Sequence, residues 1–225
     1  MKVLVFGQEK EKIQKLVEES GLEVVEKDPE AVISYGGDGT VMRSEYEFPG
    51  IPKVILRGSH VCKLCSNLPN GEVLKRVKEG KYSTLEIPKL KAEAGGNTIF
   101  GLNDIVIHNK DARHALRYTI KINGVPIQEE IIGDGIVVAT PFGSTGYYRS
   151  ITDSFFEVGI GLAFNNSTEQ ADHVVLRDDS EIRIDILRGP AVVYADNQEE
   201  TVELQEGEYA TVEKSGEIAK IIIAS

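Results

Sequence analysis

Short apolar runs separated by turn residues recur through the first part of the chain. Residues 3–6 form such a run, and residues 10–20 follow with apolar side chains at helical spacing before Gly21. Three more strands and one short helix are expected at residues 22–26, 31–35, 53–56 and 72–78. This alternation predicts an open, largely parallel α/β sheet, whose ligands would bind beyond the carboxyl ends of its strands.

After Tyr82 the pattern changes to a succession of strands, many with alternating apolar and polar residues. The expected strands cover residues 85–93, 98–102, 105–108, 116–122, 136–139, 160–164, 174–176, 181–187, 191–195, 201–204, 209–213 and 219–223. Gly95-Gly96-Asn97, Asn123-Gly124 and Ser215-Gly216 have the composition of hairpin turns. This half is therefore predicted to be all-β and sandwich-like.

The change of pattern predicts two domains. Residues 1–90 would form the α/β domain, and residues 91–225 a β-rich domain, with the last strand as a candidate to pack back on the first domain. The boundary is expected between residues 82 and 96, because the strand-and-helix alternation ends there.

A glycine-rich motif, Gly36-Gly37-Asp38-Gly39-Thr40, directly follows the apolar run at residues 31–34. Glycines after a buried strand allow a turn with positive φ and a close approach of the backbone to a ligand, and outward N–H groups can bind phosphate oxygens. Asp38 would repel phosphate, so it is best explained as holding a cation or accepting a proton from a nucleophile. Taken alone, the motif is also compatible with an ordinary tight turn.

Three further polar segments adjoin predicted strands. Thr140-Pro141-Phe142-Gly143-Ser144-Thr145-Gly146-Tyr147 follows the run at 136–139, and its hydroxyls, N–H groups and aromatic rings suit a nucleotide. Asn103-Asp104 precedes the strand at 105–108, and Asp134-Gly135 precedes the one at 136–139. Each of these two pairs, taken in isolation, also suits a simple turn.

Composition narrows the range of partners. The chain has 225 residues, a formal net charge of -11 and a sequence pI near 4.9, which argue against a broad nucleic-acid or anionic-membrane surface. Its N-terminal apolar run is too short for a signal peptide, and no stretch approaches the roughly 20 apolar residues that span a bilayer. We therefore expect a cytoplasmic protein that binds anions only by local geometry.

Cys62 and Cys65 form a single Cys-x-x-Cys, with His60 two residues before it. The three side chains are compatible with metal ligation or, for the cysteines, with a redox pair. A structural zinc site requires four ligands and the chain has no second cysteine pair, so a structural role is favoured and no metal ligands are predicted.

Three of these motifs, taken together in their order along the chain, resemble the NAD kinase family: residues 36–40, 103–104 and 140–147. The Gly-Gly-Asp-Gly-Thr motif is shared with diacylglycerol and sphingoid-lipid kinases, whereas Thr-Pro-x-Gly-Ser-Thr-x-Tyr is far more specific. Asp196-Asn197-Gln198 is similar to a late Asp-Gly-Gln turn of the family, and Asp104 stands where the family usually has Glu.

The resemblance implies transfer of a phosphoryl group from ATP to the adenosine ribose 2′-hydroxyl of NAD, giving NADP, with Mg²⁺ or another divalent cation. Asp38 would be the catalytic base or orienting group for that hydroxyl. The implied binding residues are Gly36, Gly37, Gly39 and Thr40 in the first motif, and Asn103, Asp104, Asp134, Thr140, Gly143, Ser144, Thr145, Gly146, Tyr147, Asn197 and Gln198 in the others.

The resemblance also implies a homodimer or homotetramer, in which Asp134 often serves a neighbouring subunit. It leaves open whether ATP, another triphosphate or polyphosphate is the donor, and whether NADH is accepted. Two alternatives differ in class: a lipid kinase that shares the first motif, and a regulator that binds the dinucleotide without catalysis.

Overall fold

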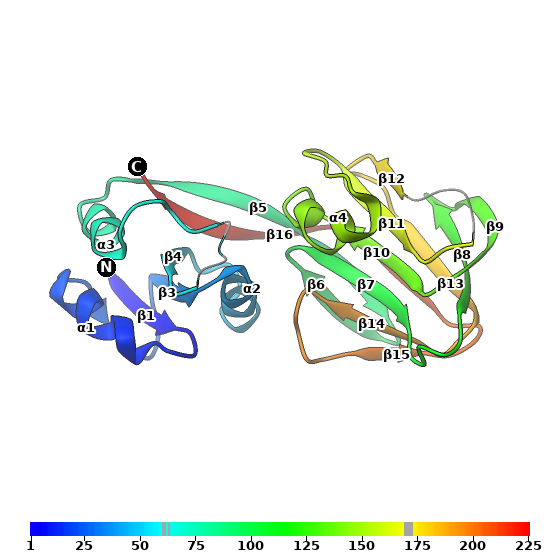
Figure 1. Cartoon of the computed structure of the whole chain (residues 1–225), viewed down its shortest axis with the longest axis horizontal. Coiled ribbons are helices and arrows are strands. Elements are labelled where there is room, and N and C mark those ends of the chain that lie inside the picture. Colours follow the sequence, from blue (N-terminus) through cyan, green and yellow to red (C-terminus); the bar gives the residue numbers. More distant parts are fainter. Residues whose placement is uncertain (60–61, 63, 169–172) are drawn as a thin grey trace. The chain divides into compact units, whose positions relative to one another are not determined.

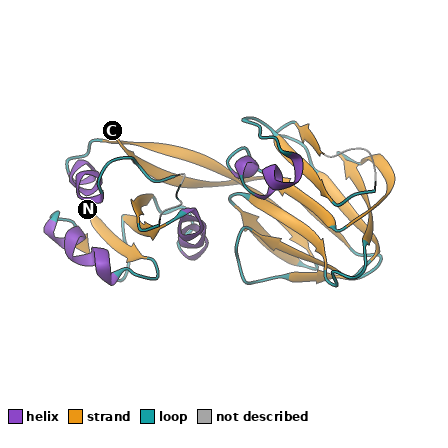
Figure 2. Cartoon of the chain, in the orientation of Figure 1, coloured by secondary structure: helices purple, strands orange, loops and turns teal. Residues whose placement is uncertain are grey.

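The computed structural model describes residues 1–59, 62, 64–168 and 173–225, so His60 lies outside the described residues. The fold divides into two compact units (Figure 1): unit 1 consists of Met1–Ile87 with Glu217–Ser225, and unit 2 of Pro88–Gly216. Figure 2 shows that strands dominate unit 2, whereas unit 1 combines strands with helices. No helix in the described part of the chain is long and apolar enough to cross a membrane.

Unit 1 contains a parallel sheet in the order β2-β1-β3-β4-β16. Its strands are β1 Lys2–Phe6, β2 Glu23–Val24, β3 Ala31–Gly36, β4 Lys53–Arg57 and the last part of β16 Tyr209–Ala224. The middle strands are apolar on both faces, because helices pack on them, and β3 and β4 carry almost continuous buried runs. The predicted α/β class is therefore confirmed.

Among its described residues, unit 1 has three helices: α1 Glu11–Glu19, α2 Asp38–Glu47 and α3 Asn70–Lys78. Helices α1 and α3 share one apolar cluster with the sheet, to which they contribute Ile13, Val17, Val73, Leu74 and Val77. Helix α2 packs against β3 and β4 and was not expected from the sequence. Its only buried apolar side chain is Val41, so it lacks the apolar stripe that reveals a helix in a sequence.

A buried ion pair joins the end of α2 to the start of β4. The side chains of Lys53 and Glu45 are 0% and 4% exposed, and the Lys53 ammonium group is bonded to the Glu45 carboxylate. Lys53 Nζ also donates to the carbonyl oxygens of Phe48 and Ile51, each at 2.6 Å, while Glu45 Oε1 accepts from Gly50 N at 3.0 Å. These added hydrogen bonds offset the cost of removing two charges from water.

Unit 2 is an all-β sandwich with one helix beside it. A six-stranded antiparallel sheet has the order β12-β11-β10-β7-β14-β15, and faces a second layer formed by β9, β8, β13, the first part of β16, and the β5-β6 pair. The elements are β5 Tyr82–Ala94, β6 Asn97–Gly101, β7 Asp104–Asn109, β8 Leu116–Ile122, β9 Val125–Gly133, β10 Gly135–Ala139, the 3-10 turn η1 Gly143–Thr145, α4 Tyr147–Thr152, β11 Ile160–Asn165, β12 His173–Leu176, β13 Ile182–Arg188, β14 Ala191–Ala195 and β15 Val202–Leu204. The sandwich-like prediction is confirmed, and one apolar cluster fills the space between the layers.

Turn predictions in unit 2 had mixed outcomes. Gly95, Gly96, Asn123 and Gly124 all have positive φ, as the predicted hairpins require. The turn predicted at Ser215-Gly216 is wrong, because these residues lie inside the continuous strand β16. Its two ends pair with different partners, β13 and β4, and the polar stretch between them was misread as a turn. The boundary between the units thus falls inside β5 and β16.

The Lys53–Glu45 pair gives a stability prediction. Lys53→Met should lower the free energy of unfolding by about 3–5 kcal/mol, because it leaves the Glu45 carboxylate buried without its partner. Urea unfolding measures the change. The matched control is Lys53→Met with Glu45→Met, which removes both charges and should recover most of the loss; a double variant as unstable as the single one would contradict this account.

Candidate functional site

The glycine-rich motif connects β3 to α2, at the carboxyl end of a parallel strand. Gly36 ends β3, Gly37 is the N-cap of α2 with φ -119° and ψ -169°, and Asp38 is the first helical residue. The prediction that this turn uses positive φ is wrong, since none of the motif's glycines has such a backbone. Steric space explains Gly36 instead: a Cβ there would lie 2.1 Å from Thr40 Oγ1.

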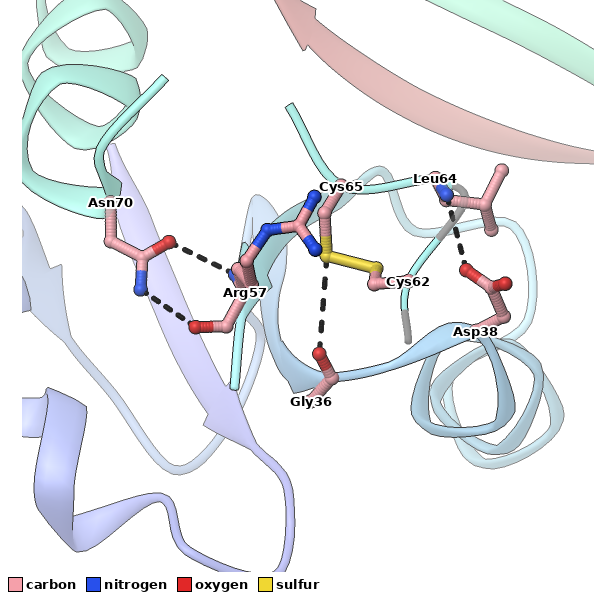
Figure 3. The surroundings of a disulfide bond; sticks show 7 residues. All are labelled: Gly36, Asp38, Arg57, Cys62, Leu64, Cys65 and Asn70. Carbon is pink, nitrogen blue, oxygen red and sulfur yellow. Dashed lines mark hydrogen bonds between the residues drawn. A yellow bond between two sulfur atoms is a disulfide. The ribbon is translucent and has the colours of Figure 1, made fainter. Parts of the chain in front are cut away.

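The Asp38 carboxylate has a defined place at the N-terminus of α2. Its Oδ1 accepts a hydrogen bond from Leu64 N at 3.1 Å, as Figure 3 shows. The helix dipole favours a negative charge at this end, and the side chain is partly exposed. Asp38 is thus an oriented carboxylate that a ligand can reach.

A second polar group, in unit 2, is organised around the backbone of Leu102, Asn103 and Asp104. Their N–H groups donate to the Asp196 carboxylate, with N–O distances of 2.8, 2.7 and 3.2 Å. Burial raises the pKa of Asp196, although its three N–H donors act in the opposite direction. Because the donors stabilise the anion, we assign the negative charge of this pair of aspartates to Asp196.

Asp104 is the protonated partner. Its side chain is 6% exposed, and burial together with the nearby charge of Asp196 raises its pKa from 3.8 to about 7. Two buried carboxyl groups with like charge cannot both ionise easily, so the proton resides on the one with less hydrogen-bond support. Near neutral pH, Asp104 can therefore act as a donor as well as an acceptor.

The loop after β10 packs directly on Asn103. Thr140 N and Oγ1 donate to carbonyl oxygens of the 102–103 segment, and Thr140 Oγ1 accepts from Gly143 N at 3.0 Å. A Cβ on Gly143 would lie 2.1 Å from Asn103 O, so only glycine fits. Ser144, 1% exposed, bonds to backbone carbonyls. The hydroxyls of Thr140 and Ser144 thus hold the loop together.

The outer face of the six-stranded sheet, on the side covered by α4, gathers the remaining polar groups. Alternation along β7 places Asp104, Val106 and His108 on this face. Val106 belongs to a small apolar cluster against which Tyr147 and Tyr194 pack. Burial, and then the charges of Asp104 and Asp134, raise the pKa of Tyr147. The pKa of Tyr194 is raised by burial and then by electrostatic interaction with Tyr147 and Asp104.

Most predicted residues of unit 2 are close together in the structure. Gln198 Nε2 donates to Phe100 O at 2.9 Å, next to the 102–104 segment, and a Cβ on Gly146 would lie 3.9 Å from Asn103 Nδ2. Asp134 lies at the other end of β10, where Asn109 and Asn166 donate to its carboxylate. Asn197 follows Asp196, and Thr145 ends η1. Gly36, Gly37, Asp38, Gly39 and Thr40 belong to unit 1.

Sequence reasoning missed several residues of this face: Asp196 as an anchor, and Tyr194, His108 and Asn165 as neighbours of Tyr147. Alternation within residues 191–195 could have placed Tyr194 opposite the core side chains. The Asp196 contacts span more than ninety residues of sequence and leave no local signal.

A comparison with family models identifies the chain. The ATP-NAD kinase C-terminal domain matches residues 102–224, which is more than half of the 225 residues. The chain belongs to the NAD kinase family. The match begins at Leu102, where the segment bound by Asp196 starts, and includes the whole polar face of unit 2.

Curated NAD kinases are similar to this family member over most of its length. This chain is 29% identical over 170 residues to the NAD kinase of Methanopyrus kandleri, and the match covers 71% of this chain and 61% of the relative. It is 31% identical over 176 residues to the NAD kinase of Agathobacter rectalis, and this match covers 74% of this chain and 62% of the relative. These matches therefore span about three fifths of the relatives' own length.

Two solved structures share the fold of this NAD kinase family member. An NAD kinase from Archaeoglobus fulgidus in complex with ATP gives a TM-score of 0.81 at 20% identity, covering 100% of this chain and 94% of that one. Yeast NADH kinase complexed with NADH gives a TM-score of 0.85 at 17% identity, and the match covers 100% of this chain and 84% of the yeast chain.

Cys62 and Cys65 form a disulfide beside the glycine motif (Figure 3). Cys65 Sγ lies 3.9 Å from Gly36 O; because a disulfide sulfur carries no hydrogen, this is a contact and not a hydrogen bond. Bonded to each other, the sulfurs are not thiolates available to a metal. On the other side, the Asn70 amide bonds to both the N–H and the carbonyl of Arg57, each at 2.9 Å.

The disulfide predicts a modest effect of reduction. In the chain-entropy account, so short a closed loop stabilises the fold by about 2 kcal/mol or less. Adding a dithiol should lower the free energy of unfolding of the wild type by that amount and leave a Cys62→Ser/Cys65→Ser variant unaffected. Titration of two free thiols in the untreated, folded protein would contradict the pairing.

The Asp104 carboxyl predicts how stability depends on pH. Its folded-state pKa of about 7 exceeds its ordinary 3.8, so between these values the Asp104 carboxyl is more protonated in the folded protein than in the unfolded chain. The contribution of Asp104 to the free energy of unfolding should therefore fall as the pH rises from about 4 to about 7. Asp104→Asn should remove this contribution, whereas Asp179→Asn, at a 65% exposed side chain, should retain it. Equal pH profiles for the wild type and Asp104→Asn would refute the assignment.

Proposed function

We propose that this protein is an NAD kinase, which transfers a phosphoryl group from ATP or a related donor to the adenosine ribose 2′-hydroxyl of NAD. The observation that carries the proposal is that the chain has both an oriented, accessible carboxylate, Asp38 in unit 1, and a polar face in unit 2 that the family model matches. The names of the curated relatives, and the ATP and NADH complexes of the two similar folds, support it.

Asp38 would act on the acceptor hydroxyl. Phosphoryl transfer needs an in-line nucleophile and stabilisation of charge on the transferred group, with little covalent help from the protein. The Leu64 N–H fixes one carboxylate oxygen of Asp38, which limits the side chain's freedom. A carboxylate held in this way can align the 2′-hydroxyl and accept its proton as the bond to phosphorus forms.

A divalent cation would neutralise charge on the donor phosphates when it is bound. Among the described residues, no three His, Cys, Asp or Glu side chains gather into a metal site. Mg²⁺ needs no such cluster, since it commonly binds through substrate phosphates with one or two carboxylates and water. The described residues are therefore compatible with a cation held mainly by the donor phosphates and water, and Asp38 keeps its proposed role toward the hydroxyl.

The polar face of unit 2 would bind the dinucleotide. A protonated Asp104 can donate to a ribose oxygen or ring nitrogen without adding a second charge next to an anionic ligand. Asn103, Thr145, Gly146 and Tyr147 would contact the same molecule. Asp134, held by two asparagine side chains, would do so as well, within a homodimer or homotetramer.

The decisive variant is Asp38→Asn. It should still bind NAD but form NADP about 10²–10⁴ times more slowly, because the amide cannot accept the proton. NAD binding is measured by calorimetry, and NADP by a coupled assay with Mg-ATP, other triphosphates and polyphosphate. Asp28→Asn is the matched control: Asp28 is exposed, and its φ of 50° is one that asparagine tolerates.

Each alternative outcome has a clear reading. Wild-type turnover in Asp38→Asn would remove Asp38 from the mechanism. NAD binding by the wild type with no NADP from any donor would indicate a dinucleotide-binding regulator. Phosphorylation of diacylglycerol without NADP formation would indicate a lipid kinase.

A further inference from the structure

Three side chains of unit 2 form a hydrogen-bonded relay that ends at Tyr147. Asn165 Nδ2 lies 3.2 Å from His108 Nε2 and 3.1 Å from the Tyr147 hydroxyl oxygen. His108 Nδ1 lies 3.1 Å from the carbonyl oxygen of Asn109. The relay connects strands β7 and β11 with the first residue of α4, on the polar face described above.

The sheet register explains why these side chains meet. Gly135 of β10 pairs with His108 on one side and with Asn165 on the other, so the three residues form one row across the sheet. Side chains in one row project from the same face, and the central glycine has none. The row therefore leaves an open gap across β10 that the His108 ring and the Asn165 amide bridge.

With a neutral His108 ring, the donors and acceptors in the relay allow only one arrangement. A carbonyl oxygen can only accept, so His108 Nδ1 carries the hydrogen bonded to Asn109 O. The neutral ring then has a lone pair on Nε2, which accepts one N–H of the Asn165 amide. The other N–H of that amide donates to the Tyr147 oxygen, so the phenolic proton points away from Asn165.

We propose that Asn165 and His108 are positioning residues that make Tyr147 a hydrogen-bond donor toward an acceptor atom of the bound dinucleotide. The inference rests on the proposed function. The Tyr147 phenol is protonated at neutral pH and can donate, since its ordinary pKa of 10.0 is raised further by burial and the neighbouring carboxylates. The expected partner on the ligand is a ribose oxygen or a ring nitrogen of the nucleoside.

Protonation of His108 would reverse the relay. The cation presents N–H at Nε2, so the Asn165 amide must turn its oxygen toward the ring, and the same oxygen then accepts from Tyr147. The phenol donates inward and its bond to the ligand is lost. Other titratable groups face this side of the sheet from the neighbouring elements: Asp104 on the same strand, Asp134 before β10, Tyr194 on β14, Glu203 on β15, His173 on β12 and Tyr148 on α4. Of these, the charges of Asp104 and Asp134 raise the pKa of Tyr147 after burial does.

The test is a double-mutant cycle on NAD affinity, measured by calorimetry with the full chain. Asn165→Asp preserves shape but imposes the reversed polarity, and Tyr147→Phe removes the hydroxyl. Each should weaken NAD binding roughly 3- to 10-fold, the worth of one hydrogen bond. The double variant should bind NAD as tightly as the single variant with the lower affinity, because Asn165 acts through the same hydroxyl.

The cycle distinguishes loss of the Tyr147 hydrogen bond from electrostatic repulsion of NAD by the new carboxylate. Repulsion of NAD by the new carboxylate would persist in the Tyr147→Phe background, so additive losses would overturn the proposal, as would unchanged affinity in either single variant. If Asn165→Asp does not fold, His108→Phe in both backgrounds replaces it, with the same expected non-additivity. Absence of NAD binding by the wild type would instead refute the proposed function.

Discussion

The polar face of unit 2 depends on the Asp196 carboxylate and its three backbone N–H donors. They fix the segment from Leu102 to Asp104, on which the Thr140 side chain and the Gly143 backbone then pack. A buried carboxylate without partners is strongly unfavourable, so the arrangement holds only while all three donors point to it. The same contacts explain why the proton of the pair belongs to Asp104: the N–H groups that order the segment also stabilise the charge on Asp196.

In unit 1 the Asp38 carboxylate is positioned in another way, by polar contacts at both ends of helix α2. The Lys53–Glu45 pair attaches the last turn of α2 to β4, and Leu64 N bonds to Asp38 in the first turn. Helix α2 has little apolar surface of its own, so these polar contacts do the work that packing does in α1 and α3. A helix held by polar groups at each end can keep Asp38 in place while its flank stays open to a ligand.

The periodic part of the fold could be predicted from the sequence, because alternation and apolar runs reflect burial on one or two faces. Strands β3, β7, β10 and β14 were expected almost at their observed bounds. Strand β9 was missed because most of its residues are exposed, and α4 because it has only six residues. The motifs proposed to bind ligands were found as sequences, but the Asp196 anchor and the Asn165 relay depend on sheet register between distant strands, which no local pattern encodes.

The chain's charge of -11 constrains how it can hold an anionic ligand. Broad positive potential is absent, so attraction must come from neutral donors placed at short range. The polar face supplies them: a carboxyl group at Asp104 that keeps its proton to about pH 7, and the Tyr147 phenol, whose pKa is raised by its surroundings. Burial is the larger cause of both raised pKa values, and the negative charges of Asp196 beside Asp104, and of Asp104 and Asp134 beside Tyr147, raise them further. The low exposure of these two groups and the acidity of their surroundings therefore both favour neutral hydrogen-bond donors on this face.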